Sequence, residues 1–151
     1  MPKKEKPEGI VELEMPSQPF SLCVKIGKNF HFSGTVGEVK DGQVVGDLDE
    51  QLDAIFSKML TALAACDLSV EDIYSATILL SGDMSGYGVV NTEWETMFSV
   101  TEIKPRRKAY AVAALPFGAL VEIEFDAIRQ CDGNGCSCHD LKEDAEVHPG
   151  D

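Results

Sequence analysis

Apolar and polar residues alternate with a period of two in several short stretches of the chain, which predicts β-strands. Residues 20–26 alternate large apolar side chains with smaller or polar ones, and a second strand-like stretch at residues 29–35 follows the turn at Gly27. We expect these two stretches to pair as a first hairpin. Residues 73–80 form an apolar, partly β-branched run, which is typical of a buried strand.

Two other stretches repeat apolar residues at spacings of three and four, which predicts amphipathic helices. The first covers residues 47–66 and begins at Asp47, whose side chain is a suitable N-cap. Between the first hairpin and this helix, residues 37–46 are rich in glycine and form a loop or a small extra hairpin. The apolar positions of the two helices are Leu48, Leu52, Ile55, Phe56, Met59, Leu60 and Leu63 in the first, and Val89, Val90, Trp94, Met97 and Phe98 in the second.

The C-terminal part of the pattern predicts a second hairpin. Residues 109–115 and 120–128 are strand-like, and a Pro-Phe-Gly turn separates them. The order ββ-α-β-α-ββ predicts a single sheet with both helices on one face, an α+β domain of residues 17–130. Residues 1–16 are charged and contain several prolines, so we expect a flexible or loosely docked arm there.

Charged side chains concentrate around this second hairpin. Glu122, Glu124 and Asp126 alternate with apolar residues, which places three carboxylates on one face of the strand. Like charges in such a row repel unless cations, water or a ligand offset them. In the expected pairing, Arg107 lies six residues beyond the partner of Glu122, roughly 20 Å away at about 3.3 Å per residue. If Arg107 and Glu122 serve one site, they therefore come from different subunits of an oligomer.

The composition argues against some classes of protein. The formal net charge of −13 disfavours nucleic-acid binding, because phosphate contacts need a positive surface. No apolar run approaches the ~20 residues of a membrane span. The first residues lack the apolar core of a secretory signal, so we expect a cytoplasmic protein. The five cysteines are an odd number and do not suggest a disulfide framework; Cys23 and Cys66 fit buried apolar positions.

After Arg129 the composition changes to an acidic stretch. Residues 131–151 contain hardly any large apolar side chains, which predicts a disordered or extended tail. Their spacing lacks the C-x2-C pairs of common structural zinc sites, so we expect no bound metal in this tail. The residues of the tail that could ligate a metal ion are Cys131, Cys136, Cys138 and His139.

Several motifs together resemble one known family. The Pro-x-Arg of residues 105–107, the Leu-Pro-x-Gly-Ala of residues 115–119 and the Val-Glu-Ile-Glu of residues 121–124 are similar to the C-terminal signature of the RidA/YjgF family. These are the reactive-intermediate deaminases, formerly called endoribonuclease L-PSP. Phe-Ser-Gly at residues 32–34 and the Val-Asn-Thr-Glu run that begins at Val90 extend the likeness, which covers about residues 17–130. The resemblance implies a chorismate-mutase-like fold, a homotrimer with sites between subunits, and no cofactor.

The resemblance also implies roles for individual residues. Arg107 takes the position of the arginine that binds a substrate carboxylate, and its guanidinium fork suits a small 2-imino or 2-keto acid. The structural alternative for Arg107 is a salt bridge to the acidic strand face. Glu122 takes the position of the acid that places or activates the attacking water. Ser33 and Asn91 match residues that orient ligand or water, although a turn or helix-start hydrogen bond explains each of them equally well.

Other positions depart from the family's pattern. Phe20 stands where many members have Tyr, Lys108 replaces a small Ser or Thr, Ala109 stands where some members have Cys, and Thr35 replaces Gln. We expect all but Thr35 to line the ligand pocket. These changes imply a pocket with an altered preference for size or charge, with Lys108 as a second cation near Arg107.

The function that the resemblance implies is hydrolysis of imines and enamines of the 2-aminoacrylate type to 2-keto acids and ammonia. A non-catalytic family member that binds small ligands or acts as a chaperone is one alternative, because Phe20 and Lys108 alter the pocket. The ribonuclease or translation-inhibitor activity historically attached to the family is another. The net charge and the lack of a His–His or His–Lys motif suited to RNA cleavage count against it.

Overall fold

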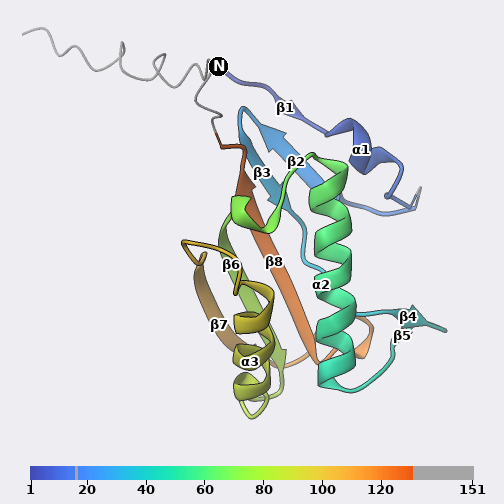
Figure 1. The fold of residues 1–151 in the computed structure, drawn as a ribbon. Helices are drawn as coiled ribbons and strands as arrows, with labels where there is room; N and C mark the ends of the chain where they lie inside the picture. The colour runs from blue at the N-terminus through green and yellow to red at the C-terminus, as the bar shows by residue number, and fades with distance from the viewer. Residues whose placement is uncertain (16, 131–151) are drawn as a thin grey trace, which may run out of the picture.

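The computed structural model describes residues 1–15 and 17–130 (Figure 1). Six strands form one sheet in the order β1-β2-β3-β8-β6-β7, and β4 pairs with β5. The predicted acidic tail, with its cysteines, lies outside the described residues. The elements are β1 (Lys4–Glu5), α1 (Glu8–Val11), β2 (Cys23–Ile26), β3 (Asn29–Phe32), β4 (Val39–Lys40), β5 (Gln43–Val44), α2 (Leu48–Ala65), β6 (Ile73–Ser81), α3 (Tyr87–Met97), β7 (Arg106–Val112) and β8 (Val121–Ile128), with 3₁₀ turns at Val70–Asp72 and Pro116–Gly118.

The six-stranded sheet carries α2 and α3 on the same face, which confirms the predicted α+β class. α2 packs against β8 and α3, and α3 lies over the end of the sheet formed by β6 and β7 (Figure 1). The core fills the space between the two layers. Within the described residues, no element covers the opposite face, which we call the open face. Large side chains of the core that are fully buried include Phe30, Ile55, Ile78, Phe98 and Phe125.

Helix α2 forms where its apolar stripe predicts it. The Asp47 side chain accepts a hydrogen bond from the backbone N–H of Glu50 and so caps the first turn. The buried Gln51 ties the helix to two other segments, because its Nε2 donates to the Gly46 carbonyl and its Oε1 accepts from the Leu120 backbone N–H. None of the helices in the described part of the chain is long and apolar enough to cross a membrane.

Strand β6 lies between β7 and β8 in the sheet. It runs parallel to β7 and antiparallel to β8, so both of its edges are hydrogen-bonded. Ala76, Ile78 and Leu80 face the core, while Thr77 and Leu79 on the open face are partly buried. This internal position explains why most residues of β6 are buried or partly buried on both faces.

The predicted hairpin of residues 109–115 and 120–128 is wrong. β7 and β8 lie on opposite sides of β6 and do not pair with each other. The connection between them passes through a 3₁₀ turn, in which Phe117 and Gly118 have left-handed φ angles of 57° and 66°. In its observed place β8 satisfies the backbone groups of β3 and β6, whereas a hairpin with β7 leaves an edge of each of those strands unpaired.

Both other expected hairpins are present. β2 and β3 pair antiparallel, with Gly27 at a φ of 61° in the turn. The glycine-rich residues 37–46 form the small extra hairpin β4–β5 rather than an unpaired loop. At its tip Asp41 and Gly42 have φ angles of 51° and 75°, as a tight two-residue turn requires.

The N-terminal segment is attached more firmly than the loosely docked arm that we expect from its charge. β1 pairs with β2, and Ile10 of α1 is completely buried in the core. Glu14 accepts hydrogen bonds from Lys6 Nζ at 2.6 Å and from the backbone N–H of Leu22 at 2.9 Å. A single apolar anchor among charged residues gives no periodic signal, so the sequence pattern does not reveal this docking.

Candidate functional site

The two principal predicted residues lie on opposite faces of the sheet. Arg107 is opposite Ala76 of β6, and Ala76 is opposite the core residue Phe125 of β8, so Arg107 shares the face that the helices cover. Glu122 is opposite Leu79, which belongs to the open face. A single subunit therefore presents the cation and the carboxylate to different sides of its sheet.

Helix α3 holds the Arg107 side chain in place. Its Nη2 donates hydrogen bonds to the Tyr87 hydroxyl at 2.8 Å and to Asn91 Oδ1 at 2.5 Å. The guanidinium carbon lies 5.4 Å from the ring centre of Tyr87 and 5.3 Å from that of Trp94, within the range of cation–π attraction. Asn91 thus binds Arg107, and we find no helix-start hydrogen bond from its side chain in the described residues.

No carboxylate of the described residues pairs with Arg107. Both hydrogen-bond acceptors of this half-buried side chain are neutral oxygens. Its Nε and Nη1 have no acceptor within the described part of the chain, so the N–H groups of these two nitrogens remain available to a ligand. The alternative of a salt bridge to the acidic face is not formed within the subunit, because the acids lie across the sheet. A half-buried cation without a counter-charge favours an anionic ligand. Ion pairs within the described residues include those of Lys6 with Glu14, Lys40 with Glu38 and Lys104 with Glu95.

Glu122 lies on the open face beside Gly34. A Cβ on Gly34 would be 2.5 Å from Glu122 Oε1, so the carboxylate occupies space that only glycine leaves free. Thr35 and Ile123 exchange backbone hydrogen bonds of 2.8 and 3.0 Å, which fixes Gly34 next to β8. Burial raises the pKa of the half-buried Glu122 carboxyl, and the like charge of Glu124 raises it further.

Ser33 precedes Gly34 and so lies near the Glu122 carboxylate. Its Oγ donates a hydrogen bond to the Ser21 carbonyl at 2.6 Å, so the structural alternative for this residue is present. The hydroxyl oxygen can still accept a hydrogen bond from a ligand or water. Phe20, next to Ser21, is exposed and lines a groove formed with the N-terminal segment.

The neighbours of Arg107 on β7 have different surroundings. Ala109 faces the helices and packs against the core. Lys108 is exposed on the open face, where the partly buried Thr77 separates it from Glu124 in the register. Lys108 therefore does not add a second cation beside Arg107 within one subunit. The reason is that consecutive residues of a strand point to opposite faces.

The observed register also changes the distance between Arg107 and Glu122. Their partners on β6, Ala76 and Leu79, are three positions apart, and β6 lies between the two strands. Strand geometry then gives about 14 Å between the two Cα atoms instead of roughly 20 Å. The separation within one subunit remains, because the two side chains also point to opposite faces.

Two aromatic residues around Arg107 are absent from the predicted site. Tyr87 and Trp94 lie four residues before and three residues after Asn91, so the three side chains project from the same side of α3. The sequence contains this signal, because a helix that presents Asn91 to a ligand also presents the residues at these spacings.

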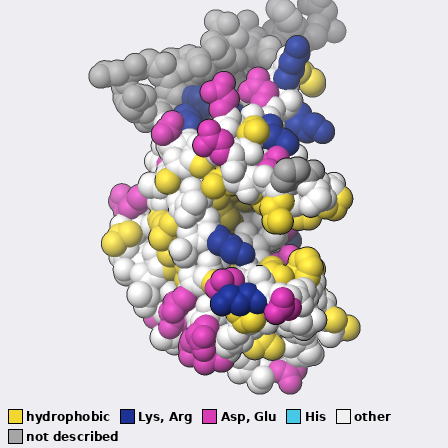
Figure 2. Space-filling model, turned by 90° about the vertical axis from the view of Figure 1, so that its right-hand side faces the viewer, with side chains coloured by type: hydrophobic (Ala, Val, Ile, Leu, Met, Phe, Trp, Pro, Cys, Tyr) yellow, Lys and Arg dark blue, Asp and Glu magenta, His cyan; other side chains and the backbone are white. Residues whose placement is uncertain are grey.

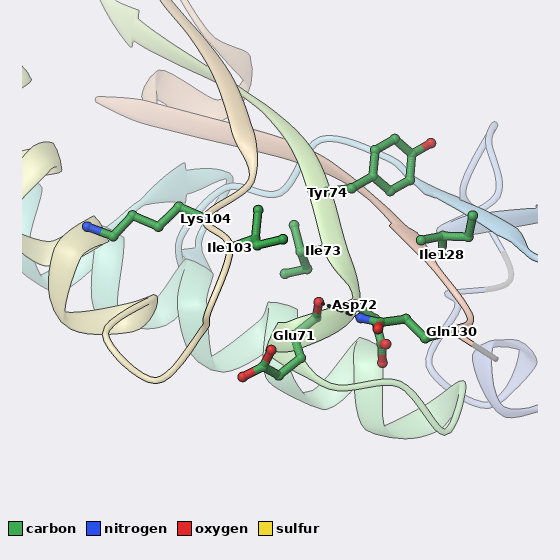
Figure 3. A pocket seen from close by; sticks show the side chains of 8 residues that line it. All are labelled: Glu71, Asp72, Ile73, Tyr74, Ile103, Lys104, Ile128 and Gln130. Atoms are coloured by element: carbon green, nitrogen blue, oxygen red, sulfur yellow. Dashed lines mark hydrogen bonds between the residues drawn. The ribbon is translucent and has the colours of Figure 1, made fainter. Parts of the chain in front are cut away.

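A separate pocket of about 200 Å³ lies at the beginning of β6 (Figure 3). Gln130 closes one side of it and donates a hydrogen bond from its Nε2 to the Glu71 carbonyl at 3.1 Å. None of the predicted site residues lines this pocket, so it is distinct from the groups around Arg107 and Glu122. Its lining consists of Glu71, Asp72, Ile73, Tyr74, Ile103, Lys104, Ile128 and Gln130.

Known proteins share both the sequence and the fold. A sequence profile described as Endoribonuclease L-PSP matches residues 12–129. The mouse protein named 2-iminobutanoate/2-iminopropanoate deaminase is 34% identical over 113 residues, which cover 74% of this chain and 82% of that protein. YyfA of Yersinia pestis, a Rid family protein of unknown function, superposes with a TM-score of 0.72 at 27% identity, covering 84% of this chain and 100% of that chain. The crystal structure of E. coli TdcF with bound serine superposes with a TM-score of 0.68 at 25% identity, covering 75% of this chain and 90% of that chain. The chain therefore belongs to the endoribonuclease L-PSP family, which is also called the RidA/YjgF family.

Proposed function

We propose that this protein hydrolyses 2-imino acids and their enamine tautomers to 2-keto acids and ammonia, without a cofactor, at sites between the subunits of a homotrimer. The observation that carries the proposal is the state of Arg107, a half-buried cation that two neutral oxygens and two rings hold in place. The remaining N–H groups, on Nε and Nη1, can donate charge-assisted hydrogen bonds to a carboxylate. The deaminase name of the mouse relative and the serine bound to TdcF support a small ligand with a carboxylate.

Glu122 supplies the proton transfer in this proposal. Its carboxylate accepts a proton from a water molecule whose oxygen adds to the C=N carbon, and the nitrogen receives a proton in return. The carbinolamine hydroxyl then gives its proton to the amino group, with Glu122 as the relay, while the C–N bond breaks and the C=O bond forms, which releases ammonia and leaves the 2-keto acid. The raised pKa of Glu122 makes its carboxylate a stronger base than an exposed one. Ser33 and Asn91 orient the water and the ligand by hydrogen bonds.

The proposal requires assembly, because Arg107 and Glu122 point to opposite sides of one sheet. The open face also carries exposed apolar side chains, which a second subunit would remove from water. A subunit that covers this face can bring its own Arg107 to the Glu122 of its neighbour. The number of three subunits comes from the family resemblance. The exposed apolar side chains of the open face include Ile26, Tyr74, Tyr110 and Ile128.

The family's description as an endoribonuclease does not lead us to propose RNA cleavage. The formal net charge is −13. On the face drawn in Figure 2, the described Lys and Arg side chains are interspersed with Asp and Glu. Binding of a phosphate backbone instead needs a continuous positive surface.

Replacement of Gly34 by alanine is expected to lower imine hydrolysis by up to about 100-fold, because the new Cβ displaces the Glu122 carboxylate from its place. The thermal midpoint should change little, because residue 34 is exposed and has no left-handed φ. Gly88→Ala is the matched control, since a Cβ there meets open space. A wild-type kcat/KM in Gly34→Ala would mean that catalysis does not depend on the present place of the Glu122 carboxylate beside residue 34.

Replacement of Glu124 by glutamine is expected to shift the acidic limb of the pH profile of kcat/KM to lower pH. The neutral side chain removes one of the two causes that raise the pKa of Glu122, while burial remains. Asp126→Asn is the control, because Asp126 pairs with His31 and does not contribute to the Glu122 shift. An unchanged acidic limb in Glu124→Gln would mean that Glu122 does not control it.

The proposed activity is tested by coupling an amino-acid oxidase, which generates imines from several amino acids, to trapping of the imines as semicarbazones. The wild-type protein should suppress semicarbazone formation, because it consumes the imine first. The amino acid with the strongest suppression then indicates the substrate. No suppression for any amino acid would reject the deaminase. If 2-keto acids then still raise the thermal midpoint, the protein is a ligand-binding family member without turnover.

A further inference from the structure

The hydroxyl of Tyr87 meets the Arg107 guanidinium at the first residue of α3. We infer that Tyr87 is a further substrate-positioning residue, whose hydroxyl orients Arg107 and donates a hydrogen bond to the carboxylate of the bound substrate. This inference rests on the proposed function and deepens it. The Tyr87 hydroxyl is a neutral hydrogen-bond donor added to the carboxylate site. It increases the preference of that site for a charged carboxylate over a neutral ligand.

The donors around Arg107 exceed the acceptors. The Tyr87 oxygen accepts from Arg107 Nη2, and its own proton has no acceptor among residues 1–15 and 17–130. The same holds for the side-chain amide group of Asn91, whose Oδ1 is already used. Together with the free N–H groups of Arg107 Nε and Nη1, three neighbouring side chains therefore offer hydrogen bonds without a partner among the described residues. Partly buried donors of this kind are normally satisfied by water or a ligand, and an anion with several lone pairs suits them best.

The packing of the Tyr87 ring does not account for the presence of tyrosine rather than phenylalanine at this position. The ring packs against the core and lies 5.4 Å from the guanidinium carbon, and a phenylalanine ring would serve both purposes. The hydroxyl adds two other things. By accepting from Nη2 it holds this nitrogen toward α3 and leaves the N–H groups of Nε and Nη1 for the ligand. It also keeps a proton that it can donate next to that ligand.

This arrangement distinguishes a carboxylate from its neutral amide. Both oxygens of a carboxylate accept hydrogen bonds, so Arg107, Tyr87 and Asn91 can all donate to it. A carboxamide presents an NH₂ group to one of these donors, which leaves two donors facing each other. Loss of the Tyr87 hydroxyl should therefore weaken the binding of a 2-keto acid more than the binding of the corresponding 2-keto amide.

The test uses the whole 151-residue chain. It measures the affinity for 2-oxobutanoate and for 2-oxobutanamide by calorimetry, and hydrolysis of 2-iminobutanoate by the trapping assay. The variants are wild type, Tyr87→Phe and the control Tyr74→Phe, whose side chain lines the separate pocket at the beginning of β6 and makes no contact with the Arg107 guanidinium among the described residues (Figure 3). We expect Tyr87→Phe to bind 2-oxobutanoate about tenfold more weakly and to raise KM similarly, with kcat changed by less than about threefold. Tyr74→Phe should behave as wild type.

The ratio of the two affinities within one variant cancels any general loss of stability, so it decides the role of the hydroxyl even if Tyr87→Phe melts earlier. An unchanged ratio and an unchanged KM in Tyr87→Phe, with normal hydrolysis by wild type, would overturn this inference alone. A wild-type protein that neither binds 2-oxobutanoate nor hydrolyses the imine would overturn the proposed function and this inference with it.

Discussion

Alanine in place of Arg107 is expected to lower kcat/KM for imine hydrolysis at least about 100-fold, because the substrate carboxylate loses its charged partner and its orientation. The side chain has no ion pair in the described residues, so its removal breaks no salt bridge within the subunit. We therefore expect the free energy of unfolding to change far less than the activity. Semicarbazone trapping and urea unfolding measure the two quantities on the same preparation.

Arg106→Ala is the matched control for this variant, since Arg106 is adjacent on β7 but exposed on the open face. It should retain most of the activity. Equal losses in Arg106→Ala and Arg107→Ala would show that the assay responds to general surface charge. Full activity in Arg107→Ala would remove the carboxylate-binding role of this side chain.

The same variant shows whether the site is shared between subunits. Glu122→Gln should also be inactive, because an amide does not accept the proton from water. When Arg107→Ala and Glu122→Gln subunits are unfolded, mixed in equal amounts and refolded together, about a quarter of the interfaces combine an intact Arg107 with an intact Glu122. Activity should then return to about that fraction of the wild-type value. No recovery would mean that one subunit contributes both groups.

Aspartate in place of Asn91 is expected to abolish hydrolysis, lowering kcat/KM by about 100-fold or more, without loss of the fold. Asn91 Oδ1 already accepts a hydrogen bond from Arg107 at 2.5 Å, so a carboxylate there becomes a built-in counter-ion. It occupies the guanidinium and repels the carboxylate of the substrate. The thermal midpoint should stay equal or rise, because the new ion pair is partly buried and well placed.

Thr92→Asp is the control for the added charge, since Thr92 is the next residue of α3 and is exposed. It should leave kcat/KM within about threefold of wild type, at the scale of an exposed charge. An Asn91→Asp protein that still hydrolyses imines at the wild-type rate would mean that Arg107 does not receive the substrate carboxylate. An Asn91→Asp protein that also melts earlier would mean that Asn91 has a structural role beyond Arg107.

The sequence alone predicts most helices and strands of the fold, but it assigns β7 as the pairing partner of β8 where the structure has β6 and β3. The periodicity of residues 48–63 and the Asp47 cap predict α2, and the alternation of residues 121–127 predicts which face of β8 is buried. A period of two shows the face of a strand but not the strand it pairs with. The short separation of β7 and β8 in sequence therefore suggested a hairpin, whereas the pairing is decided by the two edges of β6.

For the candidate site, too, the sequence indicates the residues and their faces but not the groups that they meet. The family resemblance indicates Arg107, Glu122, Asn91 and Ser33, and the structure gives each of them polar or steric partners. Alternation along a strand already separates Arg107 from Lys108, so their supposed common pocket conflicts with a rule that the sequence itself provides. What the sequence does not contain is the side of the sheet on which each group meets another subunit, because that depends on surfaces formed only after folding.

The place of β8 in the sheet has a consequence for biosynthesis. β8 is the last strand of the described residues, yet it lies between β3 and β6 and contributes Val121, Ile123 and Phe125 to the core. Until these residues emerge from the ribosome, β3 and β6 each keep an unpaired edge, and α2 lacks the strand against which it packs. The domain can therefore complete its sheet and core only when β8 is available. A premature stop before β8 yields an aggregation-prone chain instead of a smaller folded protein.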